Sequence, residues 1–180
     1  AKLLLQSTGD ISGYDPETGR KKWSHRAAGL DKIPTPVANG ESVFVPGGQL
    51  MAIRPLKDGE APEVLWTSNK IRAATASPIL YQARLYAVNS VGVLTCADTE
   101  SGEVLWQERL KGPFSASPVA ADDKLYLVNE EGTTFVIDTK SEDRLLATNP
   151  LGETLLGSPA ISGGHIFVRS DGHLFCIGSN

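Results

Sequence analysis

The sequence predicts an all-β fold, namely a β-propeller built from four-stranded antiparallel blades. The first observation is a glycine turn between two apolar runs that recurs at intervals of 39, 44, 40 and 40 residues. The turn glycines are Gly9, Gly48, Gly92, Gly132 and Gly172. A period near 40 that holds several short strands is typical of propellers and related arrays. The second observation is that Gly or Pro interrupts every stretch long enough to hold a helical period.

The composition is that of an ordinary globular protein, with 180 residues, 41% hydrophobic residues and a net charge of -4. This mildly acidic balance argues against a nucleic-acid-binding surface, which needs clustered Lys and Arg. The basic run at residues 20–26 is interpreted as a solvated strand edge. No apolar run approaches the roughly 20 residues that span a bilayer. No signal peptide is visible, and because residue 1 is Ala, we expect the chain to be processed or excised from a longer protein.

Five repeats follow one another in a single propeller domain or fragment over residues 1–180. Residues 2–23 hold a partial repeat without its first strand, and residues 155–178 hold one without its fourth. The repeats at 33–66, 74–106 and 114–146 are complete. We therefore expect three complete blades with incomplete blades at both ends, in the C-terminal part of a larger ring. A closed five-bladed ring is the alternative, and open blade edges would favour self-association.

Each complete repeat is predicted to hold four strands in a fixed order. In the third repeat, two apolar strands flank the turn at Gly92, and a second turn at Ser101–Gly102 leads to a strand that ends on Trp106. The segments KLYLV and TTFVI of the fourth repeat are rich in β-branched and aromatic residues. We expect Gly132 and Gly172 to adopt positive φ, which tight hairpins require and glycine tolerates.

A second register consists of prolines that each follow Ser or Thr. These are Pro36, Pro78, Pro118 and Pro159. Proline cannot donate to a sheet, so it is tolerated at the first residue of a strand and rarely inside one. We expect each proline to begin the innermost strand of a blade, close to the central axis.

A third register has the pattern Asp-x-x-Ser/Thr-Gly-x-x-x-Trp. Its two full copies are Asp15, Thr18, Gly19 and Trp23, and Asp98, Ser101, Gly102 and Trp106. The Asp and Ser/Thr side chains can hold a turn, Gly takes the left-handed position, and Trp can anchor one blade on the next. The second repeat has Arg54 at the Asp position but keeps Trp66, and the fourth keeps Asp138 but has Leu146 where Trp is expected. We expect the three Trp side chains to be mostly buried between blades.

Cys96 and Cys176 occupy equivalent positions two repeats apart. In a radial array such positions are farther apart than the ~7 Å Cα separation that a disulfide tolerates. Both are therefore predicted to be buried free thiols that pack as small hydrophobic groups.

These motifs resemble the pyrroloquinoline-quinone-like (PQQ-like) β-propeller repeat family. The segments that carry the resemblance are YDPETGRKKW, ADTESGEVLW, the strands that begin with Ser-Pro, and the C-terminal LFCIG. The family includes quinoprotein dehydrogenases and non-catalytic members such as the B lipoprotein of the outer-membrane β-barrel assembly machine. The resemblance implies an eight-bladed ring and a periplasmic or extracellular location.

No catalytic, cofactor-binding or metal-binding constellation is visible in the sequence. His25, His165 and His173 lack metal-ligand spacing, and no nucleophile motif is present. Calcium needs six to eight oxygen ligands, whereas the acidic pairs at residues 122–123 and 130–131 are interpreted as solvated turns. The favoured interpretation is a non-catalytic propeller that binds a protein or peptide, as a scaffold or a sensor module. The alternative is a fragment of a PQQ-dependent oxidoreductase whose catalytic residues, quinone and calcium site lie outside this chain.

Overall fold

The computed structural model describes residues 3–178, and within that range it contains strands and loops but no helix. It therefore offers no helix, within these residues, that is long and apolar enough to cross a membrane. The strands in chain order are β1 Leu3–Gln6, β2 Asp10–Tyr14, β3 Lys21–Arg26, β4 Val37–Ala38, β5 Val43–Val45, β6 Leu50–Arg54, β7 Glu63–Ser68, β8 Ile79–Tyr81, β9 Arg84–Val88, β10 Val93–Asp98, β11 Val104–Arg109, β12 Val119–Ala121, β13 Lys124–Val128, β14 Thr133–Asp138, β15 Leu145–Pro150, β16 Ala160–Ser162, β17 His165–Arg169 and β18 Leu174–Ile177.

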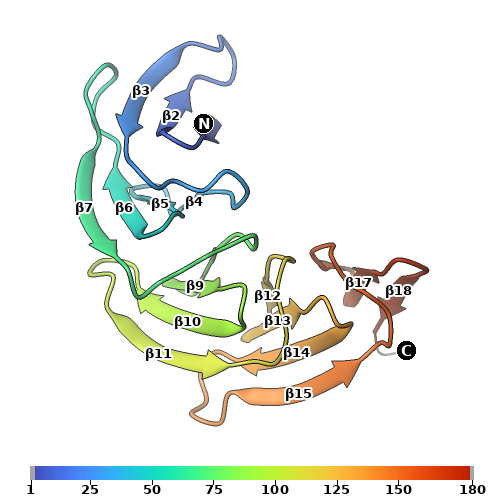
Figure 1. The fold of residues 1–180 in the computed structure, drawn as a ribbon. Coiled ribbons are helices and arrows are strands. Elements are labelled where there is room, and N and C mark those ends of the chain that lie inside the picture. Colours follow the sequence, from blue (N-terminus) through green and yellow to red (C-terminus); the bar gives the residue numbers. More distant parts are fainter. Residues whose placement is uncertain (1–2, 179–180) are drawn as a thin grey trace.

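The strands form five antiparallel sheets, each made of consecutive strands. Blade 2 (β4–β7), blade 3 (β8–β11) and blade 4 (β12–β15) have four strands, and blade 1 (β1–β3) and blade 5 (β16–β18) have three. Figure 1 shows the blades following one another around an open arc, with blade 1 and blade 5 apart. The prediction of an all-β propeller with three complete blades and two incomplete ones is confirmed. The alternative of a closed five-bladed ring is not what these residues form.

The apolar core lies between the blades. The largest cluster joins one face of blade 3 to the facing side of blade 4, and it contains Tyr86, Leu94, Leu125, Leu127 and Phe135. Similar clusters join blade 1 to blade 2, blade 2 to blade 3, and blade 4 to blade 5. Strands β5, β6, β9 and β10 are buried along most of their length because both of their faces are covered by neighbours.

The four prolines of the second register each lie directly before an innermost strand: Pro36 before β4, Pro78 before β8, Pro118 before β12 and Pro159 before β16. The residue before each proline takes part in a hydrogen-bond ladder between blades. The backbone N–H of Thr35 donates to Oγ of Ser77, that of Ser77 to Oγ of Ser117, and that of Ser117 to Oγ of Ser158, each at 2.9 Å. The hydroxyl of each blade therefore serves the backbone of the blade before it.

A β-bulge recurs between the third and fourth strands of blades 1 to 4. The residue directly after the bulge is Trp23, Trp66 or Trp106 in blades 1 to 3, where it pairs with the third strand. In blade 4 that residue is Ala147, which pairs with Val136. The prediction that Leu146 takes the Trp position is therefore wrong by one residue. The reason is a longer connection, since the N–H of Asp98 bonds to the carbonyl of Glu103 but that of Asp138 bonds to Arg144.

Two further predictions are corrected by the structure. Gly132 has φ of +84°, as expected, but Gly172 is not among the residues with positive φ. The hairpin at Gly172 is one residue shorter, because the N–H of Ser170 bonds to His173 whereas that of Asn129 bonds to Thr133. The shorter loop does not place its glycine at the left-handed position.

Cys96 is buried, but Cys176 is exposed, so the prediction of two buried thiols holds for Cys96 alone. In blade 3 the face that carries Cys96 is covered by blade 4. No described strand covers the same face of blade 5. The equivalent leucines show the same contrast, because Leu94 is 0% exposed and Leu174 is 70% exposed.

Candidate functional site

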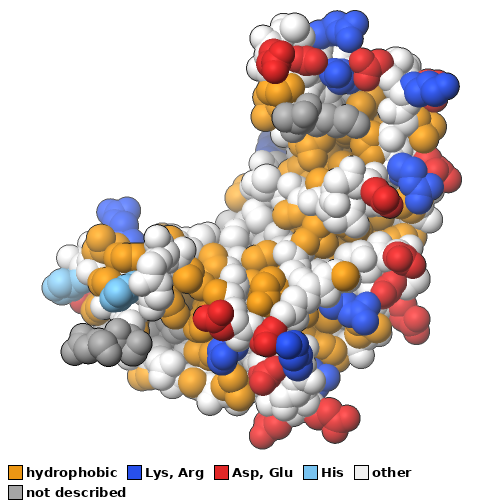
Figure 2. All heavy atoms as spheres, turned by 180° about the vertical axis from the view of Figure 1, so that it is seen from behind, with side chains coloured by type: hydrophobic (Ala, Val, Ile, Leu, Met, Phe, Trp, Pro, Cys, Tyr) orange, Lys and Arg blue, Asp and Glu red, His pale blue; other side chains and the backbone are white. Residues whose placement is uncertain are grey.

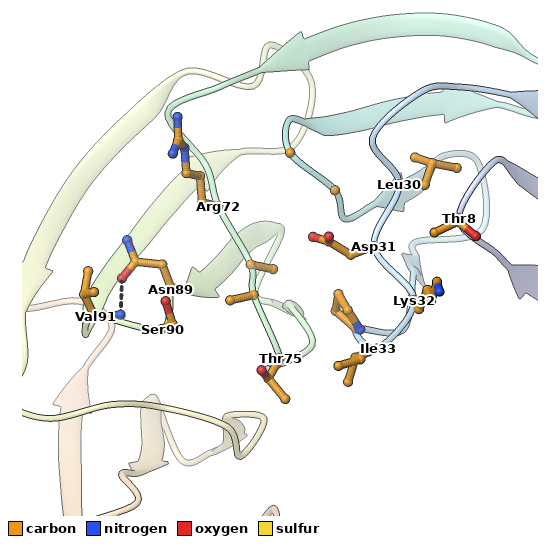
Figure 3. Close-up of a pocket in the computed structure, with 15 residues that line it drawn as sticks. Thr8, Leu30, Asp31, Lys32, Ile33, Arg72, Thr75, Asn89, Ser90 and Val91 are labelled. Atoms are coloured by element: carbon orange, nitrogen blue, oxygen red, sulfur yellow. Dashed lines mark hydrogen bonds between the residues drawn. The ribbon is translucent and has the colours of Figure 1, made fainter.

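A groove of about 770 Å³ crosses blades 1 to 3 at one end of their strands (Figure 3). One wall is the connection between β3 and β4, and the other is the connection between β7 and β8 together with the β9–β10 hairpin. The hairpins at Thr8 and at Gly47–Gly48 also border it. In an antiparallel blade, the hairpin between the second and third strands lies at the same end as the connection to the next blade. The first-register turns of blades 1 to 3, at residues 8–9, 47–48 and 89–92, are therefore the turns that border this groove.

Oppositely charged side chains stand on the two walls of the groove. Figure 3 shows the carboxylate of Asp31 pointing from one wall into the space, and Arg72 standing on the other wall. Nε of Arg72 donates to the carbonyl of Asn69 at 3.0 Å, which holds the side chain in place while the terminal nitrogens stay exposed. Within residues 3–178, neither Asp31 nor Arg72 has an ion-pair partner. Lys32, which is exposed beside Asp31, also lines the groove and has no ion-pair partner among these residues, so three charges face a ligand.

Asn89 brings an amide to the same wall as Arg72. Its Oδ1 accepts hydrogen bonds from the N–H groups of Val91 and Val93 and so closes the β9–β10 hairpin. Asn129 does the same in blade 4, where its Oδ1 accepts from Thr133. The Nδ2 group of Asn129 also donates to the carbonyl of Lys111 at 2.9 Å, whereas Nδ2 of Asn89 has no partner among the described residues. One hydrogen-bond donor is thus left for a ligand.

Exposed apolar side chains complete the lining. Ile33 is 67% exposed and Val91 is 57% exposed, although both are large aliphatic residues. Figure 2 shows the molecule from behind. Most charged side chains on this face lie along the outer rim of the arc, and apolar and small side chains lie nearer its inner side. Polar groups that fix orientation among apolar contacts are the usual composition of a binding site.

The Asp turns of the third register lie at the other end of the strands, away from the groove. Oδ1 of Asp15 accepts from the N–H groups of Thr18 and Glu17, and these bonds lower the pKa of Asp15 to about 2. Oδ1 of Asp98 accepts from Ser101 and Glu100, which also lowers the pKa of that carboxyl group. Asp138 makes the same two backbone bonds, and its pKa is lowered as well. These carboxylates accept hydrogen bonds from the backbone N–H groups of their own turns, so their role is structural.

The tryptophans of the third register differ in what they contact. Trp66 is half-buried, its Nε1 donates to the carbonyl of Thr99 in blade 3 at 3.1 Å, and its ring lies directly over Gly102 of the Asp98 turn. Trp23 is 4% exposed and lies over Gly13 of its own blade, with no hydrogen-bond partner for Nε1.

Trp106 is half-buried, and the guanidinium of Arg144 lies 4.6 Å from its ring centre. The expectation that all three tryptophans are mostly buried is therefore met by Trp23, while Trp66 and Trp106 keep part of their rings in solvent.

Of the residues that sequence reasoning missed, Asp31 and Arg72 lie in connections between blades and match no repeated motif. Asn89 lies in the β9–β10 hairpin, and the available signal was its recurrence 40 residues later as Asn129. A second missed cluster joins blades 4 and 5, where Glu153 accepts from the hydroxyl of Ser170 and lies 2.6 Å from Nδ1 of His173. The Ser170 bond first, and then His173, lower the pKa of Glu153. The Ser170 hydroxyl bonds to Glu153 and to the backbone of His173 but not to its ring, so the cluster lacks the nucleophile-to-base bond of a catalytic triad.

The side chains available for a quinone-linked calcium ion do not fit that role. Among residues 3–178, no three His, Cys, Asp or Glu side chains come close enough to hold a metal ion. Of the acidic pairs noted in the sequence, Asp123 is bound by Lys140 and Gln82, and Glu130 accepts from Ser115. Because these carboxylates are already used by neighbouring side chains, no catalytic step is assigned to them.

Comparison with known proteins relates the chain to one propeller family. Residues 58–146 match a PQQ-type family described as outer membrane protein assembly factor BamB. No curated protein sequence matches the chain.

Three solved structures share the fold. BamB from Moraxella catarrhalis has 17% identity and a TM-score of 0.75 over 95% of this chain, and the computationally designed protein Ika8 has 13% identity and a TM-score of 0.77 over 99%. Sqt1 from Saccharomyces cerevisiae has 12% identity and a TM-score of 0.78 over 99%. The chain spans about 55% of the length of each of these three structures. The family match over residues 58–146 and the shared fold, together with the repeats described above, support a PQQ-like β-propeller family for this chain.

Proposed function

We propose that this chain is a non-catalytic propeller scaffold that binds a protein or peptide partner in the groove across blades 1 to 3. The observation that carries the proposal is the groove lining, in which exposed Ile33 and Val91 accompany the unpaired charges of Asp31 and Arg72. An exposed aliphatic side chain and an unpaired charge in one concavity gain more from a partner than from water.

The relatives support the same proposal at a coarse level. The matching family is described as an outer membrane protein assembly factor. By the same resemblance, we propose a periplasmic or extracellular location. The partner's identity does not follow from a shared fold, since one fold hosts many functions.

The test is selection of peptides from a random display library on the purified chain, followed by affinity measurement with labelled peptides. Groove binders should lose affinity when Ile33 is replaced by Ser, and should keep it in a Leu105→Ser control, which changes a 44% exposed leucine on β11. Equal loss in both variants, or no selected peptide, contradicts the proposal. The proposal also assigns no cofactor. Titration with PQQ and Ca²⁺ should leave the quinone absorbance unchanged, and saturable binding of the quinone would instead support the oxidoreductase alternative.

A further inference from the structure

We infer that the open edge of β1 binds an extended strand of a second polypeptide, in which Ser or Thr is followed by Pro and an aliphatic residue. β1 (Leu3–Gln6) pairs with β2 on one side and with no described residue on the other. The corresponding strands β5, β9, β13 and β17 each pair on that side with the innermost strand of their own blade. An unpaired strand edge takes an added strand through main-chain hydrogen bonds.

The hydroxyl ladder between the blades sets how the added strand begins. The residues before three of the innermost-strand prolines each donate a backbone N–H to the hydroxyl of the equivalent residue in the next blade: Thr35 to Ser77, Ser77 to Ser117, and Ser117 to Ser158. Thr35 is exposed, and among residues 3–178 no group donates to its own Oγ1. A strand added to blade 1 would place the N–H before its proline at this hydroxyl. The ladder that joins blades 2 to 5 would then continue by one step.

The pairing in the other blades also shows which residue of the added strand lies beside Leu4. In blade 3, Ile79 directly follows the proline and pairs with Tyr86. Leu4 is the counterpart of Tyr86, because each pairs with the residue two positions before the Asp of its blade's Asp turn. Tyr86 is 1% exposed, whereas Leu4 is only half-buried. The residue after the proline of the added strand would pair with Leu4 and cover it.

A cavity of about 780 Å³ borders Leu4 on the side of blade 2, and it is suited to an aliphatic side chain. Its lining includes Val43, which is 4% exposed, and Ala38, which is exposed on the innermost strand of blade 2. In blade 3 the residue after the proline packs against the cluster shared with the following blade. The same residue of the added strand would therefore face blade 2. The blades themselves place an aliphatic residue here: Val37, Ile79, Val119 and Ala160.

The charged residues at this cavity do not require a charged strand. Arg54 lines the cavity and pairs with Glu63 at 3.1 Å. Glu41 also lines it and is exposed between β4 and β5. Main-chain pairing, the Thr35 hydroxyl and apolar burial are therefore the features that select the strand. This edge is separate from the charged walls of the groove, so the inference does not rest on the proposed function.

The first experiment uses a strand that the chain itself places in this position. A labelled peptide with blocked ends and the sequence of residues 74–81, Ala-Thr-Ala-Ser-Pro-Ile-Leu-Tyr, is titrated with the full chain and followed by fluorescence anisotropy. Binding should be saturable, and it should be at least about 10-fold weaker when Asp replaces the Ile of the peptide, because a charge would enter an apolar site. A scrambled peptide should be equally weak. Equal affinity for all three peptides overturns the inference.

The second experiment tests the hydroxyl. In one peptide an ester oxygen replaces the N–H of the Ser, and in the protein Thr35→Val removes the acceptor but keeps the backbone N–H that binds Ser77. Each change alone should weaken binding about 2- to 10-fold, as loss of one hydrogen bond predicts, and the two together should weaken it no further. Thr148→Val, at an exposed threonine of β15, should have no effect. Losses that add independently overturn the assignment of Thr35.

The third experiment fills the cavity. Ala38→Trp should weaken peptide binding at least 10-fold without lowering the melting temperature, because Ala38 is exposed. Ala160→Trp, at an exposed alanine on the innermost strand of blade 5, should leave binding unchanged, and so should Ile33→Ser in the groove. Unchanged binding in a folded Ala38→Trp variant overturns the inference. Light scattering tests the other occupant: a dimer that Ala38→Trp dissociates would mean that a second copy of this chain fills the edge, and the inference would be wrong.

Discussion

Replacing Gly102 by Ala should destabilise the protein more than the same change at Gly19, and the difference isolates one contact between blades. Both glycines occupy the same position of the Asp turn, and both have φ of +70°. An added Cβ at Gly19 meets nothing within 4 Å, whereas one at Gly102 would lie 2.5 Å from Cε3 of Trp66. The left-handed conformation costs an L-residue roughly 1–2 kcal/mol, and this cost applies to both variants.

The additional cost at Gly102 arises because the Trp66 ring has to move. Movement breaks the bond from Nε1 of Trp66 to Thr99, worth about 0.5–1.5 kcal/mol, and loosens packing against Phe44, whose ring centre lies 5.9 Å from that of Trp66. We therefore expect Gly19→Ala to cost about 1–2 kcal/mol and Gly102→Ala about 2–4 kcal/mol.

Urea unfolding followed by circular dichroism measures both changes. In a Trp66→Ala background, Gly102→Ala should cost no more than Gly19→Ala does, because the ring that it displaces is gone. A double-mutant cycle therefore reports the coupling directly. A coupling energy below about 0.5 kcal/mol, the usual error of additivity, would refute the idea that Trp66 anchors blade 2 on the turn of blade 3.

Three other outcomes follow from the structure. Ala83→Gly should stabilise the protein by about 0.5–1 kcal/mol in the same urea assay, because Ala83 is exposed and has φ of +58°. An unchanged free energy of unfolding would mean that Ala83 is not strained in the β8–β9 turn. In the native protein, Cys176 should react with a thiol reagent as fast as it does in the unfolded protein, and Cys96 should react only after unfolding. Equal rates for the two cysteines in the native protein would contradict the burial of Cys96. The pKa values of Asp15 and Asp98 are lowered by backbone hydrogen bonds, so their stabilisation is complete above the ordinary value near 3.8 and is lost as pH falls, for Asp15 through about 2. Melting temperature should therefore fall between about pH 4 and pH 2 in wild type, less steeply in Asp15→Asn, and parallel curves would exclude this contribution.

The repeat was readable from the sequence because its signals are local. Glycine turns, prolines before strands and Asp turns each depend on a few neighbouring residues, so their spacing alone gave the blades. Errors arose where a loop changed length by one residue. The longer connection after Asp138 shifted the Trp position from Leu146 to Ala147, and the shorter hairpin at Gly172 removed its positive φ.

Contacts between blades were much harder to predict, because they join residues about 40 positions apart. The exposure of Cys176 depends on which blade covers its face, and no local pattern reports that. The groove was missed for the same reason. Asp31 and Arg72 belong to separate connections, 41 residues apart, and only the curvature of the arc brings them to one site.

The ladder of hydroxyls from Ser77 to Ser158 has a consequence for how the number of blades can change during evolution. Each blade carries one acceptor for the blade before it and one N–H that needs the hydroxyl of the blade after it. A duplicated unit of about 40 residues therefore brings its own acceptor and its own donor, and both find partners at the new junctions. A deletion of a whole unit removes one of each. Gene duplication can thus change the number of blades without leaving an unpaired amide inside the array. Changes of one or two residues in loop length are also tolerated, since the three steps of the ladder span 42, 40 and 41 residues.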